Sequence, residues 1–167
     1  AIYMVKPDFI IPGFQKSGTT AIYFTLKNQF SDIVYLAKNN QSNATSSLEP
    51  DFFTPPDSQN SHLGKDWYFS LFNNNAVING EKSPSYLQAY LYAVPEIKRV
   101  LPDIKLLISM RNPTTRAFSA YNHYTQDYPK SKKWGKWDHT KNFYENFFSK
   151  DNAFKEMGIY WKPIDLI

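Results

Sequence analysis

The chain has 167 residues, of which 42% are apolar and 17% aromatic, a composition that excludes a disordered chain. It contains no Cys, which excludes disulfides and thiolate metal sites, and its three His residues are too scattered to indicate a metal cluster. The net charge of +4 suits an anionic ligand but is weaker than that of most nucleic-acid-binding proteins.

The length and the ends of the sequence indicate how many domains, membrane spans and signal segments to expect. A chain of this length is expected to form one domain. The longest aliphatic run, Leu106 to Ile108, is far below the ~20 residues of a membrane-spanning helix, and Ala1 to Asp8 lacks the order of a signal peptide. Because the sequence does not begin with Met, it is consistent with an excised piece of a longer protein, and we expect membrane attachment only through a segment outside this chain.

The first half of the chain begins with a predicted strand and helix joined by a tight loop. Phe9 to Ile11 is a short apolar run that ends at Pro12-Gly13. After this loop, apolar side chains at positions 22, 26 and 30 follow the spacing of one helix face. Polar composition then predicts two loops, at residues 37–47 and 54–62.

The second half repeats the alternation of helix and strand. Its segments are predicted as a short helix at 67–72, a strand at 76–78, a helix from 87 that Pro95 restarts, a strand at 104–110, a helix from Asn112-Pro113 to about Gln126, and a short helix at 143–148. This alternation predicts an α/β fold with a central, mostly parallel sheet flanked by helices.

The loop after the first strand is a candidate anion site, because backbone N–H groups and the positive end of a helix meet there. Gly13, Gly18 and Thr20 match the nucleotide P-loop pattern G-x-x-x-x-G-K-[ST]. Thr19 stands where that pattern has Lys, and the Lys comes earlier, at Lys16. This displacement argues against a magnesium-dependent kinase. A Gly-Thr turn with an incidental Lys is the alternative.

A polar stripe on a later helix is the second candidate site. Its members are spaced 4, 3 and 4 apart and so share one helix face: Asn112, Arg116, Ser119 and His123. Arg111 precedes this helix at the carboxyl end of a strand, where ligands of open α/β sheets bind. Arg111 and Ser119 could therefore hold a phosphate, through a guanidinium fork and a hydroxyl. A solvent-exposed face with a capping Asn is the alternative.

Together these segments resemble the two cofactor signatures of the sulfotransferases that use 3′-phosphoadenosine 5′-phosphosulfate (PAPS). The resemblance is carried by residues 16–20 (KSGTT) and by Arg111-Asn112-Pro113 with Arg116, Ser119 and Tyr121. Residues 64–68 resemble the family's G-x-x-W-Y, residues 81–86 its E-K-[ST]-x-x-Y, and residues 48–53 its base segment, N-E-x-H-F-F or similar. The likeness is strongest to Golgi glycan enzymes, especially heparan sulfate N- and O-sulfotransferases.

The resemblance implies which residues hold PAPS. Five loop residues would bind its 5′-phosphosulfate: Lys16, Ser17, Gly18, Thr19 and Thr20. Arg111 and Ser119 would bind its 3′-phosphate. Lys16 would also stabilise the departing phosphate, so that no metal is required. In the base segment, Asp51 stands where the family usually has His.

Three residues compete for the role of the catalytic base. Glu49 matches the family's catalytic Glu, and burial of the two Phe that follow could anchor it at the cleft. His123 matches a His of the N-sulfotransferases, and imidazole is a common proton acceptor near neutral pH. Glu81 ranks third, because with Lys82 it resembles a structural or substrate-orienting pair. A surface Glu and a capping or packing His are the alternatives for the first two. Lys82 and Trp67 are predicted to contact the substrate.

We therefore predict a P-loop-like three-layer sulfotransferase domain over residues 1–167, lacking the family's C-terminal part with its Gly/Lys-rich loop. It would transfer a sulfuryl group in line to a hydroxyl or amine of a glycan. A non-catalytic PAPS- or glycan-binding module and, less favoured, a P-loop kinase are the alternatives. Acceptor triplets at Asn40 and Asn43 fit a glycosylated protein of the Golgi lumen or secretory pathway. The basic stretch 130–136 either steers an acidic glycan or is a solvated loop.

Overall fold

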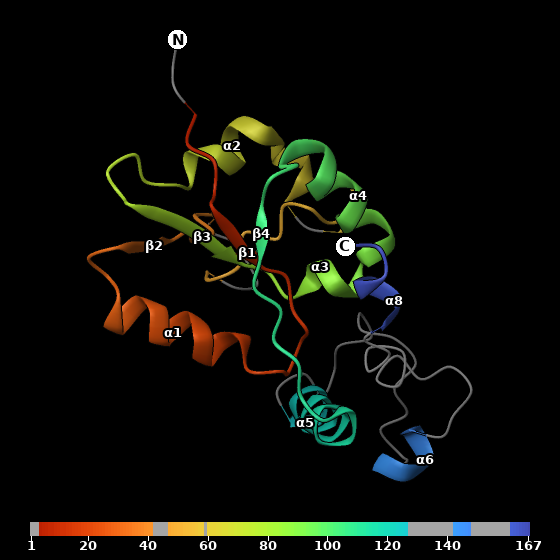
Figure 1. The fold of residues 1–167 in the computed structure, drawn as a ribbon. Helices are drawn as coiled ribbons and strands as arrows, with labels where there is room; N and C mark the ends of the chain where they lie inside the picture. The colour runs from red at the N-terminus through yellow and green to blue at the C-terminus, as the bar shows by residue number, and fades with distance from the viewer. Residues whose placement is uncertain (1–3, 42–46, 59, 127–141, 148–160) are drawn as a thin grey trace.

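A computed structural model describes residues 4–41, 47–58, 60–126, 142–147 and 161–167 of the chain. A four-stranded, all-parallel sheet lies at its centre, in the order β2-β3-β1-β4 (Figure 1). The strands are β1 (Phe9–Ile11), β2 (Val34–Leu36), β3 (Ile78–Lys82) and β4 (Lys105–Leu106). The helices are α1 (Thr19–Gln29), α2 (Gly64–Ser70), α3 (Ser85–Gln88), α4 (Tyr90–Val100), α5 (Pro113–Gln126), α6 (Phe143–Phe147) and α8 (Trp161–Ile164), with a 3₁₀ turn η1 (Ser61–Leu63).

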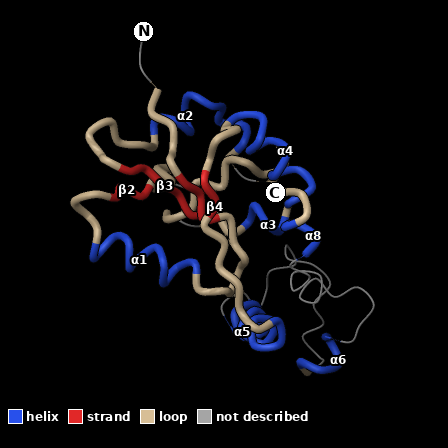
Figure 2. The backbone as a smooth tube through the Cα atoms, viewed as in Figure 1, coloured by secondary structure: helices blue, strands red, loops and turns tan. Residues whose placement is uncertain are grey.

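Helices cover both faces of the sheet. Figure 1 shows α1 on one side and α2, α3 and α4 on the other, and the tube in Figure 2 shows the strands between them. On the α1 side, Tyr23 is fully buried. On the opposite side, the core is rich in aromatic residues, among them Phe52, Phe53, Tyr68 and Tyr86. The predicted α/β fold with a central parallel sheet flanked by helices is therefore confirmed.

The strand predicted at 76–78 is shifted along the chain, because β3 begins at Ile78 and runs to Lys82, while Val77 is 73% exposed. The Asn-Gly-Glu-Lys sequence of β3 is polar, yet all four residues are buried. Packing explains why position 80 is Gly, since a Cβ there would lie 2.2 Å from the ring of Phe9. Because the buried residues of β3 are polar, hydrophobic patterning does not detect this strand.

Two further strands differ from the sequence prediction. β2 lies at the edge of the sheet and was not predicted. β4 is shorter than the predicted strand 104–110, although the chain beyond it still pairs with the β1 segment. The N–H of Leu107 donates to the Ile10 carbonyl at 2.9 Å, and the N–H of Ser109 donates to the Gly13 carbonyl at 3.2 Å. This pairing brings Arg111 close to the loop that follows β1.

Pro95 does not restart a helix, because it lies inside α4, and the break between α3 and α4 falls at Ala89. Pro95 has no N–H to donate to the carbonyl of Leu91, and Leu91 is 73% exposed, so water can take that place. The predicted face of α1 is also partly wrong, since Phe30 is 44% exposed and Tyr23 is the buried apolar residue.

Some predictions fall outside the described residues, namely the basic stretch 130–136 and the acceptor triplet at Asn43. Within the described ranges, none of the helices combines the length and the apolar character needed to cross a bilayer. The carboxyl ends of β1 and β3 lie side by side, with Ile11 opposite Lys82. Figure 1 shows the start of α1 and helix α5 at this same end of the sheet.

Candidate active site

The loop between β1 and α1 has an unusual backbone. Gly13 and Gly18 have positive φ angles of 137° and 92°, and Lys16 has a φ of 63°. The loop is fixed to the segment after β4, because the N–H of Phe14 donates to the Ser109 carbonyl at 3.0 Å and the N–H of Ser109 returns a bond to Gly13. The Lys16 side chain is half-buried. The chain thus curls tightly at the carboxyl edge of the sheet.

Polar groups of this loop point to an anionic ligand. Helix α1 begins at Thr19 with Gly18 as its N-cap, and no side chain caps its first turn. The hydroxyl of Ser17 is buried and makes no hydrogen bond within the described part of the chain. Thr19 is buried, whereas Thr20 is exposed. A buried hydroxyl beside an uncapped helix N-terminus fits a phosphate-type oxygen, which would accept these donors.

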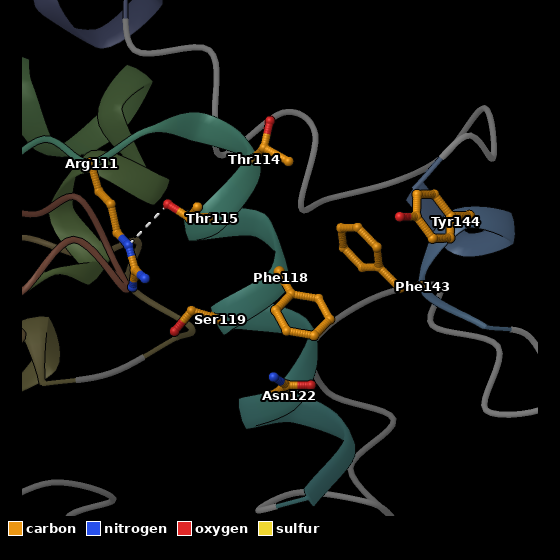
Figure 3. Close-up of a pocket in the computed structure, with 8 residues that line it drawn as sticks. All are labelled: Arg111, Thr114, Thr115, Phe118, Ser119, Asn122, Phe143 and Tyr144. Atoms are coloured by element: carbon orange, nitrogen blue, oxygen red, sulfur yellow. Dashed lines mark hydrogen bonds between the residues drawn. The ribbon is translucent and has the colours of Figure 1, made fainter.

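Arg111 and Ser119 lie together at the second candidate site. Asn112 caps α5 as predicted, since its Oδ1 accepts the N–H groups of Thr114 and Thr115 at 3.1 and 3.3 Å. The Nε of Arg111 donates to the hydroxyl of Thr115 at 3.1 Å. Both Arg111 and Ser119 line a cavity of about 550 Å³. Figure 3 shows their side chains on one side of α5, with the rings of Phe118, Phe143 and Tyr144 on the other.

The polar stripe of α5 is not a solvent-exposed face throughout. Arg116 is fully buried, as are Ala117 and Ala120 beside it. Ser119 and His123 are half-buried. The stripe therefore turns partly inward at Arg116, which argues against the alternative of a solvent-exposed face.

Glu49 and Lys82 form an ion pair at the carboxyl end of β3. The Nζ of Lys82 lies 2.5 Å from Oε1 of Glu49, and the side chains are 2% and 26% exposed. The other carboxylate oxygen, Oε2, makes no hydrogen bond to any described residue. The ring of Tyr23 lies beneath the lysine, with its centroid 6.0 Å from Nζ. A buried cation thus holds a carboxylate whose second oxygen is left for another partner.

Glu81 precedes this lysine but is enclosed. Its carboxylate is fully buried and accepts hydrogen bonds from Tyr68 at 2.6 Å, from Ser83 at 2.8 Å and from Tyr86 at 3.1 Å. Burial raises the pKa of Glu81 to about 7, and these three hydroxyl donors oppose that rise. A carboxylate with no access to solvent cannot reach an acceptor. The geometry therefore favours a structural role for Glu81, which ties β3 to α2 and α3.

The two remaining predicted residues occupy different places. His123 lies in the last turn of α5, on the same helix as Ser119. The indole N–H of Trp67 donates to Oδ1 of Asn40 at 2.9 Å, and its ring centroid lies 6.4 Å from that of Phe52. Trp67 therefore has a packing role, and its predicted stacking on a sugar stays a prediction. In the described ranges, no cluster of three or more His, Asp or Glu could hold a metal ion.

Sequence reasoning noticed Asp51 only as a departure from the family's base segment, and it did not find that Asp51 is buried or that hydroxyl groups surround the carboxylates. Asp51 is 4% exposed and close to Lys82. Ser83, Ser85 and Tyr86 all donate to a buried carboxylate. The likeness of residues 81–86 to the family's E-K-[ST]-x-x-Y marked this segment, but it did not show which carboxylates the hydroxyl groups contact.

Comparison with known proteins identifies the class of this chain. A family model described as "Sulfotransferase domain" matches residues 6–164. The chain therefore belongs to the sulfotransferase domain family. A solved structure of a sulfotransferase from Alicyclobacillus acidocaldarius superposes with a TM-score of 0.66 at 25% identity, over 97% of this chain and 68% of that one.

Particular relatives are similar in sequence. The chain is 36% identical over 121 residues to a bifunctional heparan sulfate N-deacetylase/N-sulfotransferase 1 of Xenopus laevis. It is 35% identical over 123 residues to a bifunctional heparan sulfate N-deacetylase/N-sulfotransferase 2 of Homo sapiens. Each match covers 70% of this chain but only 13% of the relative. The predicted likeness to heparan sulfate sulfotransferases is confirmed, for a small part of those relatives' length.

Proposed function

We propose that this chain transfers a sulfuryl group from PAPS to a hydroxyl or amine of a glycan. One observation carries the proposal: the loop after β1, with its buried Ser17 hydroxyl, and the Glu49–Lys82 pair lie at adjoining strand ends, where Ile11 is opposite Lys82. Ligands of open parallel sheets bind at such carboxyl ends. Membership of the sulfotransferase family supports the reaction class.

Residues at both candidate sites fit the anionic groups of PAPS. The buried hydroxyl of Ser17 and the uncapped start of α1 would receive the 5′-phosphosulfate, with Lys16 beside them. Arg111 and Ser119 line one cavity, and a guanidinium with a hydroxyl is a suitable pair for the 3′-phosphate. When bound, PAPS would supply a sulfuryl group whose bond to the phosphate oxygen breaks as the acceptor atom bonds to sulfur.

The chain's own residues would manage the proton and the charge. Glu49 would accept the proton of the acceptor at Oε2, while Lys82 holds the carboxylate through Oε1. Lys16 would neutralise the charge that develops on the departing phosphate. His123, on α5, is the second choice for the base. Trp67 and Lys82 remain proposed contacts of the substrate.

The acceptor and the compartment follow by analogy. The relatives are named as heparan sulfate enzymes, so we propose a glycan of that type, acidic in character. The same likeness supports a place in the Golgi lumen or secretory pathway. The exposed Asn40, which begins an acceptor triplet, is compatible with glycosylation there.

The proposal is tested by measuring binding and transfer on one set of variants. Isothermal titration with adenosine 3′,5′-bisphosphate should detect binding to the wild type, and Arg111→Ala should weaken it about tenfold or more. Arg99→Ala is the matched control, because Arg99 is exposed on α4. Radiolabelled sulfate should pass from PAPS to an N-desulfated heparan acceptor. Binding without transfer would support a non-catalytic module, and magnesium-dependent ATP binding would support a kinase.

A further inference from the structure

Asp51 is a second carboxyl beside the Glu49–Lys82 pair, and the proposed reaction gives it no role. It is 4% exposed and lies two residues after Glu49. Its φ angle is 49°, in the left-handed region that most residues avoid but that Asp and Asn tolerate. The chain therefore makes a tight turn directly after the candidate base.

Hydrogen bonds fasten this turn to the residues that follow Lys82. The Ser85 hydroxyl donates a short bond to the Asp51 carboxylate, and the Asp51 N–H donates to the Ser83 hydroxyl oxygen at 3.0 Å. The N–H of Phe52 donates to the Tyr86 hydroxyl at 3.0 Å. Three bonds thus connect the segment that carries Glu49 to the segment that carries Lys82.

The charges around Asp51 are consistent with a supporting role. Burial raises the pKa of Asp51 to about 7, and Glu49 raises it further, while Ser85 and Lys82 lower it. Near neutral pH the carboxyl therefore holds a proton for much of the time. It does not add a full negative charge that would compete with Glu49 for the lysine. Glu81 and Tyr86 also interact electrostatically with Asp51.

We propose that Asp51 is a positioning residue: held by Ser85, it fixes the turn that presents Glu49 to Lys82, and it affects transfer only through Glu49. This inference rests on the proposed function, because it takes Glu49 as the base. The acceptor and PAPS would make no contact with Asp51. Removing the side chain should therefore lower turnover without weakening the binding of the nucleotide.

The test combines three variants with Glu49→Gln. Asp51→Ala and Ser85→Ala should each lower kcat about ten- to a hundredfold, because a misplaced base loses its alignment. Asp51→Asn should stay near wild type, since Asn tolerates the left-handed backbone and its amide oxygen can accept the Ser85 bond. Affinity for adenosine 3′,5′-bisphosphate should not change. In the Glu49→Gln background, Asp51→Ala and Ser85→Ala should cost little more.

Several outcomes would overturn the inference. Equal losses in both backgrounds would mean that Asp51 acts independently of Glu49. Equal losses in Asp51→Asn and Asp51→Ala would mean that the charge matters and not the turn. If Glu49→Gln alone left turnover unchanged, the proposed base would fail and the positioning role with it. Thermal melting checks folding, and Ser85→Ala tests the same contact without altering the backbone of residue 51 if Asp51→Ala does not fold.

Discussion

Two ion pairs of this molecule have nearly the same length but lie in different surroundings. Lys82 and Glu49 approach to 2.5 Å at the carboxyl end of the sheet, where the lysine is 2% exposed. Arg99 and Glu96 approach to 2.6 Å on the outer face of α4, where the arginine is 57% exposed. Solvent screens the second pair and competes for its hydrogen bonds. Distance alone therefore does not distinguish the two pairs, whereas burial does, and it is the buried pair that we propose to be functional.

The surroundings of the two pairs also differ in what else is charged. Asp51 lies within electrostatic reach of the Lys82 pair, and the buried Glu81 directly precedes the lysine. Lys65 is the other charged group that acts on Glu96. Burying one lysine among three carboxyl groups costs desolvation free energy, unless each charged group has a partner. Such an arrangement is typical of a site that holds a carboxylate for chemistry.

A large effect on the transfer rate is expected at Lys16, which lies in the loop after β1 and not on the outer face of α4. Lys16→Ala should lower the rate of sulfate transfer about 10²–10³-fold, because the departing phosphate loses a preorganised cation. Lys27→Ala is the matched control, since Lys27 lies at the far end of α1 and should leave the rate unchanged. Steady-state transfer assays at saturating PAPS would measure both. Wild-type rates in Lys16→Ala would remove Lys16 from the site.

A smaller effect is expected on stability at Lys82. Lys82→Met keeps most of the volume but leaves Glu49 without its cation, and should cost about 2–3 kcal/mol of unfolding free energy. The melting temperature should fall by about 5–10 °C. Arg99→Met breaks the exposed pair and should leave the melting temperature unchanged within error. Similar losses in both variants would contradict the difference drawn between the two pairs.

The pH dependence of stability should also separate the two regions, because Glu81 and Glu96 have pKa shifts of opposite sign. Burial raises the pKa of Glu81 to about 7, so the folded chain binds more protons than the unfolded chain between about pH 4.5 and 7. Stability should therefore fall as the pH rises through this window, by about 1.4 kcal/mol per pH unit for one such carboxyl. Glu81→Gln should reduce that slope in melting experiments, and the raised pKa of Asp51 should leave the remainder.

Glu96 should behave in the other direction. Hydrogen bonding from Arg99 lowers the pKa of Glu96, so its small contribution is present above the unfolded pKa and is lost as the pH falls through the folded one. Glu96→Gln should therefore change stability only slightly, and less at acid pH. For Glu81, the argument from burial would be contradicted if stability changed with pH as steeply in Glu81→Gln as in the wild type.

The sequence was sufficient for features that depend on neighbouring residues. The short apolar run of β1, the Gly-Thr start of α1 and the Asn112 cap of α5 are local signals, and all three are present in the structure. β3 was misplaced because its polar residues are buried, and Glu81 accepts hydrogen bonds from hydroxyl groups of α2 and α3, which hydrophobic patterning does not show. Helical spacing placed Arg116 on the polar stripe, but its burial was not predicted, because periodicity does not tell which neighbours cover a side chain.

In the candidate site too, local signals were predicted from the sequence and tertiary contacts were not. Arg111 and Ser119 were predicted together from helical spacing, and they line one cavity. Glu49 was singled out from its likeness to a family motif, but its pairing with Lys82 required the fold, since the two residues are 33 apart in the sequence. Asp51 was noticed only as a departure from that motif. Its burial and its bond to Ser85 are tertiary features that no local pattern encodes.

The central claim is that Glu49, held by buried Lys82, is the base of a sulfotransferase. The most direct measurement is the rate of sulfate transfer from PAPS to a hydroxyl acceptor, which must lose a proton in the transition state. The proteins compared are the wild type, Glu49→Gln, His123→Ala and the surface control Glu96→Gln. The account predicts that Glu49→Gln lowers kcat about 10²–10⁴-fold while affinity for adenosine 3′,5′-bisphosphate stays unchanged, with small effects in the other two variants. Turnover near that of the wild type in Glu49→Gln, with the large loss in His123→Ala, would contradict it.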